Sequence, residues 1–168
     1  RQAVASLAAK GLVRVEHGRG IFVEEGAIDY VLGRRTRFTE NLAAAGIESR
    51  RELVRAVEQP ASAEIAARLR LKPGTRLVLV EALAEARGRP VSLAEHYFPA
   101  RRFAGVGEAF ARLGSISKAL RAYGVEDYSR KVSFVSARLP DERSARLLRQ
   151  PATRPVLHVE SVNVDAGG

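Results

Sequence analysis

Residues 1–23 read RQAVASLAAKGLVRVEHGRGIFV, and this stretch decides how the start of the chain folds. Its first apolar residues have helical spacing, and Gly11 stands where a left-handed residue commonly ends a helix. Two short strands are predicted over residues 12–15 and 21–24. The segment EHGRG between them is predicted to form a tight turn with a basic tip, because glycine adopts positive φ at little cost.

The order helix, strand, glycine-flanked basic turn, strand is typical of the end of a winged helix-turn-helix. Glycines allow the backbone to lie close to phosphates, and an arginine at the tip can reach a phosphate or a minor groove. An ordinary hairpin with no nucleic-acid partner is the alternative. We predict a partial DNA-binding domain over residues 1–26, of which the chain holds the end of the recognition helix and the wing. The candidate DNA contacts are Arg1, Gln2, His17, Gly18, Arg19 and Gly20.

Composition restricts the class of protein. The 168 residues carry a formal net charge of +9, with 46% hydrophobic residues and no cysteine. This is ordinary for a folded chain, and it leaves no disulfide framework and no thiolate nucleophile. An excess of arginine suits anionic partners, although an Ala/Arg-rich composition also follows from a GC-rich genome. No apolar run is long enough to span a membrane, and we expect a cytoplasmic protein.

The rest of the chain predicts an α+β domain over residues 27–168. A linker over residues 25–38 leads into helices and strands in the order α-β-α-β-β-α-α-β-α-β. A β-hairpin turns at Arg87-Gly88-Arg89, and short turns of this kind favour antiparallel pairing. Ser62, Ser115 and Asp141 are the predicted helix caps. One helix is predicted over residues 101–112 and a second from Ser115 through Tyr123 to Gly124, and Pro60 is predicted to stop a strand. Residues 165–168 resemble a hairpin turn, so a further C-terminal strand is expected to be missing.

Several stretches resemble a known family. The opening 23 residues resemble the end of a GntR-type winged helix. The stretches RGRPVSLAEHYFPARRF, LGSISKALRAYGVEDYSR and LLRQPATRPVLHVESVNVD resemble the UTRA effector-binding domain of the HutC subfamily. Within it, the phosphonate-metabolism (PhnF-type) regulators are the most similar branch. The resemblance implies a fold like chorismate lyase, with an antiparallel sheet, helices and a ligand pocket beside the sheet. It also implies a homodimer whose effector changes the spacing of the paired DNA-binding domains.

The first candidate effector site lies where the linker meets the domain. Three guanidinium groups and a hydroxyl stand together at residues 34–37, just before a predicted helix N-terminus at Thr39. Cations beside a helix N-terminus can bind an anion, whereas a solvated basic linker is the alternative. The family's equivalent loop leads into the pocket, which favours ligand contacts by Arg35, Thr36, Arg37 and Phe38.

Other candidates lie further along the chain. Ser115 and Ser117 stand at a helix start, where hydroxyls can hold a phosphonate oxygen, although Ser115 can equally be a plain helix cap. Tyr128 and Arg130 are predicted to share a strand face, and Arg130 is an anion contact by resemblance, unless it pairs with Asp127 or Glu126.

Glu95 and Tyr97 also share a predicted strand face. Glu95 could hold an amino group of a ligand or form a structural ion pair with Arg101 or Arg102. Relatives that bind amino-sugar phosphates carry arginines near the places of Ala82 and Ala84, and this departure weakens an amino-sugar assignment.

The sequence thus predicts a transcriptional regulator, and more specifically a repressor, that senses a small phosphorus-containing anion and binds operator DNA. A chorismate lyase-like enzyme and a dimerisation module without a ligand are the alternatives. The three histidines lack the spacing of a metal site, so no metal and no cofactor are expected.

Overall fold

The computed structural model describes residues 2–9, 12–16, 18–23, 42–43 and 46–167. The chain divides into two compact units, Arg1–Tyr30 and Val31–Gly168. In the first unit, helix α1 (Gln2–Ala9) precedes the antiparallel strands β1 (Val13–Glu16) and β2 (Gly20–Val23). Gly18 and Gly20 have φ values of 78° and 124°, so the turn between these strands requires glycine. The predicted helix, strand, turn and strand are confirmed over these residues.

The second unit is built on a three-stranded antiparallel sheet in the order β3-β4-β5. The strands are β3 (Ser49–Pro60), β4 (Arg76–Ala86) and β5 (Arg89–Pro99). The central strand β4 is almost wholly buried, because helices or polar contacts cover both of its faces. Arg87 and Gly88 join β4 to β5 with φ values of 52° and 73°, as a two-residue hairpin turn requires.

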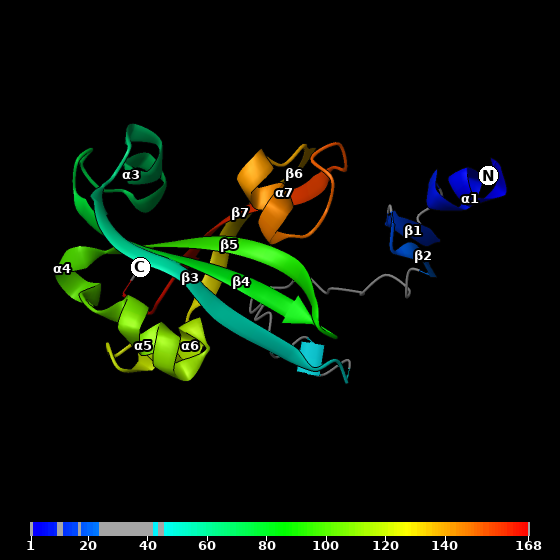
Figure 1. Ribbon diagram of the computed structural model, residues 1–168. Coiled ribbons are helices and arrows are strands. Elements are labelled where there is room, and N and C mark those ends of the chain that lie inside the picture. Colours follow the sequence, from blue (N-terminus) through cyan, green and yellow to red (C-terminus); the bar gives the residue numbers. More distant parts are fainter. Residues whose placement is uncertain (1, 10–11, 17, 24–41, 44–45, 168) are drawn as a thin grey trace. The chain divides into compact units, whose positions relative to one another are not determined.

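One face of this sheet carries the main hydrophobic core. Val78, Val80 and Ala82 of β4 pack against three consecutive helices, with Phe110 fully buried among them. Figure 1 shows these helices together on one side of the sheet. They are α4 (Ala100–Phe103), α5 (Val106–Leu113) and α6 (Ile116–Arg121).

The opposite face is covered by other elements. Helix α3 (Ala63–Leu69) places Ala66 against Leu77, with Ile65 and Leu69 at the edge of this smaller cluster. Ser62 caps the helix by accepting a hydrogen bond from the Ile65 backbone N–H at 3.2 Å. Helix α7 (Glu142–Leu147) lies on this side of the sheet too (Figure 1).

Two further strands form a separate antiparallel ribbon, β6 (Ser129–Arg138) and β7 (Val156–Val164). Phe134 of β6 lies under the Arg68 guanidinium of α3, at 4.3 Å from the ring centre, and Arg68 also pairs with Glu160 of β7 at 2.8 Å. These contacts tie one face of the ribbon to the rest of the unit.

The structure confirms the α+β class and corrects several boundaries. The predicted helix over residues 101–112 is two helices, because Gly105 adopts φ 78° between them. Tyr123 lies beyond the end of α6 and donates instead to the Ala104 carbonyl at 2.7 Å. Pro60 was expected to stop a strand and is its last residue, which an edge strand tolerates. Among the described helices, none is long and apolar enough to cross a membrane.

Candidate functional site

The predicted DNA contacts lie on the first unit. Gly18, Arg19 and Gly20 are exposed at the turn between β1 and β2, and Gln2 is exposed at the start of α1. Arg1 and His17 lie outside the described residues. The turn therefore presents a backbone and a guanidinium to solvent in the way that a phosphate contact requires.

The two serines of α6 have different environments. The Ser115 hydroxyl accepts from the Lys118 backbone N–H at 3.4 Å and caps the helix. The Ser117 hydroxyl lies 2.8 Å from the Tyr128 hydroxyl in a partly buried pair. Ser115 therefore acts as a helix cap, which is one of the two roles that the sequence allows for it. Ser117 joins a hydroxyl pair that links α6 to the start of β6.

Arg130 follows two residues after Tyr128, near the start of β6. Its Nε donates to Asn163 Oδ1 at 3.5 Å, and the strand bulges between Arg130 and Val132. The expected alternative partner Glu126 instead lies 3.9 Å from Arg121. Tyr128 precedes the strand and packs against the main core. Ser117 and Tyr128 therefore form a polar pair beside the core on the α6 side, and Arg130 follows on β6, where it contacts Asn163 of β7.

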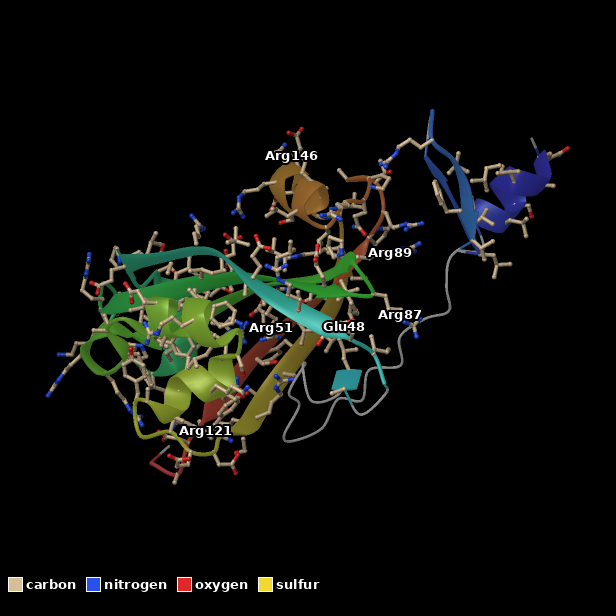
Figure 2. The ribbon with its side chains drawn as sticks, turned by 60° about the horizontal axis from the view of Figure 1, so that its bottom comes forward. Glu48, Arg51, Arg87, Arg89, Arg121 and Arg146 are labelled. Carbon is tan, nitrogen blue, oxygen red and sulfur yellow. The ribbon has the colours of Figure 1, made fainter. Side chains whose placement is uncertain are left out.

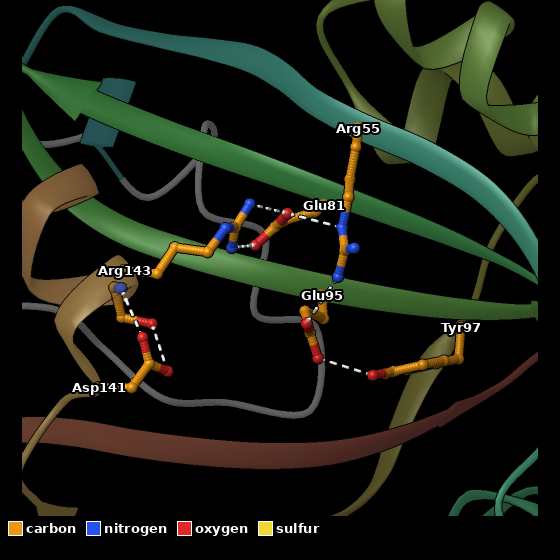
Figure 3. A network of polar contacts seen from close by, with 7 residues as sticks. Arg55, Glu81, Glu95, Tyr97, Asp141 and Arg143 are labelled. Atoms are coloured by element: carbon orange, nitrogen blue, oxygen red, sulfur yellow. Dashed lines mark hydrogen bonds and ion pairs between the residues drawn. The ribbon is translucent and has the colours of Figure 1, made fainter.

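Glu95 and Tyr97 belong to a different network, drawn in Figure 3. Tyr97 donates its hydroxyl to Glu95 at 2.6 Å, and Arg55 lies 3.9 Å from the other oxygen of Glu95. The sequence allowed an ion pair of Glu95 with Arg101 or Arg102, and this pairing is wrong, because Glu95 lies beside Arg55. Burial and the Glu95 carboxylate raise the pKa of Tyr97 well above its usual value, so its hydroxyl remains a donor.

The centre of this network is Glu81, whose side chain is 1% exposed. Arg143 of α7 donates to both of its oxygens, at 2.5 and 2.7 Å, and Arg55 of β3 lies 3.0 Å away. The Arg143 hydrogen bond and charge, with help from Arg55, hold the pKa of Glu81 below its ordinary value despite burial. Two cations and two carboxylates thus meet with no excess charge left to bind an anion.

The structure separates the predicted ligand residues into two groups. Strand pairing places Glu95 opposite Glu81, and Tyr97 packs with the α3 cluster. Tyr128 packs with the α4–α6 core on the other face of the same sheet. Strand β4 and its neighbours stand between the two groups. The remaining ligand candidates, Arg35, Thr36, Arg37 and Phe38, lie outside the described residues.

Two polar residues on the α4–α6 face were not predicted as ligand contacts. Arg51 of β3 stands directly across from Ala84 of β4, and His96 of β5 stands across from Val80. Burial, and then the charge of Arg51, lower the pKa of His96 to about 4, so the imidazole is neutral at pH 7. The alternation of β5 could have signalled His96, since its even positions face the core. Within the described part of the chain, no three His, Cys, Asp or Glu residues gather as metal ligands.

Comparison with known proteins decides the family. The UTRA domain model matches residues 44–168, which is most of the chain. The chain belongs to the family of UTRA-domain transcriptional regulators. It is 40% identical over its whole length to an uncharacterised HTH-type transcriptional regulator of Rhizobium meliloti, covering 69% of that protein.

Other relatives of this UTRA-domain regulator are named PhnF. The HTH-type transcriptional repressor PhnF of Mycolicibacterium smegmatis is 30% identical over 98% of the chain and is itself covered to 66%. The crystal structure of PhnF from Mycobacterium smegmatis superposes with a TM-score of 0.76 at 29% identity, covering 99% of this chain and 73% of that one. The regulator is therefore of the GntR/PhnF type, and its relatives are regulators and not enzymes.

Proposed function

We propose that this regulator is a repressor whose UTRA domain binds a small phosphorus-containing anion, a phosphonate or phosphate. The observation that carries the proposal is the hydroxyl pair of Ser117 and Tyr128 beside the core, with Arg130 two residues further along the chain, in a chain of the PhnF type. A guanidinium and two hydroxyls supply the charge-assisted and neutral donors that a phosphonate head group requires.

Within this proposal the predicted residues have different roles. Arg130, Ser117 and Tyr128 contact the effector, together with Arg35, Thr36, Arg37 and Phe38 of the preceding segment. Ser115 acts by capping α6. Glu95 and Tyr97 stabilise the sheet, because their polar atoms are already engaged with Arg55 and with each other on the opposite face.

The effector would act by linkage with DNA. Operator DNA binds one arrangement of the regulator, and the effector binds another more tightly, so each weakens the other. To be decisive the effector must prefer its own state by ~5 kcal/mol. The exposed turn of Gly18, Arg19 and Gly20 would contact the DNA backbone.

We propose that the regulator is a homodimer. The middle of one face of the β6–β7 ribbon carries Ser133, Val135, Leu157 and Val159, with the charged Arg130 only at the end of that face beside the bulge, and Leu157 is 69% exposed. Since the chain has a net charge of +9, an uncharged patch is the surface on which two copies meet with least repulsion. Leu157→Glu should convert the dimer to a monomer in light scattering, whereas Val91→Glu on β5 should not.

The effector proposal is tested by thermal unfolding and calorimetry. Inorganic phosphate, methylphosphonate, aminoethylphosphonate, an amino-sugar phosphate and urocanate form the panel. A true ligand at 100 times its Kd adds ~2.7 kcal/mol, which is a shift of several degrees. Arg130→Ala should abolish the shift, and Arg138→Ala at the other end of β6 should not. A cooperative melt that no phosphorus compound shifts would remove phosphorus anions as effectors.

A further inference from the structure

A second polar group lies on the α4–α6 face of the sheet, at the end that carries the β4–β5 turn. Arg51, Ala84 and Ser92 stand directly opposite one another on the three strands. Directly opposed residues of an antiparallel sheet point to the same face. The guanidinium and the hydroxyl therefore flank a methyl group, in one row across the sheet. Figure 2 shows Arg51 between the helices α5–α6 and the turn that holds Arg87 and Arg89.

Alanines surround this row. Ala82 and Ala94 are opposite each other in the next row on the same face, with Leu53 beside Ala82 on β3, so the floor between His96 and Ser92 is made of short side chains on β4 and β5. Ala82 and Ala84 are 2% and 3% exposed. A stripe of alanines by itself is ordinary core, and its meaning depends on what points toward it.

His96 lies on the same face of β5 as Ala94, two residues further along, and stands opposite Val80. Its Nε2 is shielded from solvent and has no hydrogen-bond partner among the described residues. The ring stacks on Phe98 at 6.3 Å, which fixes its plane but satisfies no polar atom. A buried polar atom without a partner costs ~1–3 kcal/mol of stability. A protein retains such an atom where another interaction, such as a bound ligand, compensates for that cost.

We propose that His96, Arg51 and Ser92 bind the anionic head group of the effector on this alanine floor. The inference rests on the proposed function and deepens it, because it names residues on the sheet face against which Tyr128 packs. Arg51 supplies the positive charge, and Ser92 supplies a hydroxyl. When the ligand is bound, it supplies the hydrogen-bond partner that Nε2 of the neutral His96 imidazole lacks.

The first experiment measures the protein without ligand. His96→Leu keeps a similar volume and removes the unsatisfied nitrogen, so the unliganded full chain should melt at the same temperature or a few degrees higher. A melting temperature several degrees lower would show that the imidazole is a structural part of the core, and it would overturn the inference.

The second experiment measures binding to the full chain by calorimetry, with inorganic phosphate, methylphosphonate and urocanate as probes. His96→Leu and Arg51→Gln should each lower the affinity for the probe that binds by ~tenfold or more, since hydrogen bonds to a charged group are lost. Tyr97→Phe, on the opposite face of the same strand, is the matched control and should leave the affinity unchanged. Equal affinity in wild type and His96→Leu would overturn the inference.

The probes separate this inference from the proposed function. Binding of urocanate alone, lost in His96→Leu, would support the sheet site and overturn the phosphorus effector. Binding of phosphate or methylphosphonate that Arg130→Ala abolishes and His96→Leu does not would uphold the proposed function and overturn the sheet site. If the wild type binds none of the probes, the phosphorus effector fails, and the melting temperature of unliganded His96→Leu decides the inference by itself.

Discussion

At the scale of single residues, the most constrained side chain is Glu81. It lies on the central strand, it is 1% exposed, and its partners come from β3 and α7. A buried carboxylate without cations would be strongly unfavourable, so Arg55 and Arg143 make its ionised state possible. The same network engages Glu95 and thereby gives two candidate ligand residues a structural task.

Glu81→Gln should destabilise the second unit by about 3 kcal/mol, because removing the charge breaks a buried ion pair and leaves two guanidiniums facing an amide. The measurement is urea unfolding of the full chain. Glu85→Gln is the matched control on the same strand and face, since its ion pair with Arg149 at 3.5 Å is more exposed and should contribute less than about 1 kcal/mol. Equal losses in the two variants would contradict the assignment.

The lowered pKa of Glu81 also predicts a pH dependence. A carboxyl whose pKa is lower in the folded state stabilises the fold above its unfolded value, 4.5. That contribution is lost as the pH falls through the folded value. The stability difference between wild type and Glu81→Gln should therefore be constant from pH 8 to 6 and should shrink below about pH 4.5. A difference that persists at pH 2 would show that packing, and not charge, accounts for the loss.

At the scale of elements, the close approach of α5 to β3 depends on a glycine. A Cβ on Gly107 would lie 2.4 Å from the Ala56 Cβ, which real atoms do not tolerate. Glycine within a helix normally costs about 1 kcal/mol relative to alanine, so this residue sacrifices helix propensity for contact. Short side chains at the helix and the strand let the two elements pack directly.

Gly107→Ala should therefore destabilise the protein by about 1–3 kcal/mol instead of stabilising it, because overpacking outweighs the gain in propensity. The double variant with Ala56→Gly removes the clash and should recover part of the loss. A double-mutant cycle measured by chemical unfolding gives the coupling. Additive effects of the two substitutions would mean that the contact does not limit the packing.

At the scale of the whole molecule, the chain combines two compact units with different tasks. The first carries an exposed basic turn, and the second carries the sheet, its helices and the polar groups proposed to bind the effector. The first unit has four basic and four acidic residues, so the net charge of +9 lies in the second unit, and charge alone does not identify the surface that contacts DNA.

The role of the turn can be measured through the salt dependence of DNA binding. On a mixed-sequence duplex, Arg19→Ala should weaken binding and reduce the slope of log K against log salt by about 1, as the loss of one phosphate contact predicts. Arg76→Ala, an exposed arginine of the second unit, is the control. An unchanged slope in Arg19→Ala would exclude the turn from the DNA contacts.

The local structure of this protein follows from its sequence alone. The caps at Ser62, Ser115 and Asp141, the turn at Arg87 and Gly88, and the order of the strands all follow from neighbouring residues. The family was also readable, because the motifs that carry it are contiguous. The sequence placed Glu95 and Tyr97 on one strand face for the same reason.

Which of these faces meet depends on contacts between distant parts of the chain. Glu81 and Arg143 are 62 positions apart, and nothing local indicates that α7 returns to the central strand. The bulges near Leu53 and Ala84 set which residues of β3 and β5 stand opposite β4, and thus which side of the sheet holds Arg51 and His96. Side-chain neighbours across a sheet depend on long-range register, so the division of the candidate site between two faces could not be read from spacing along the chain.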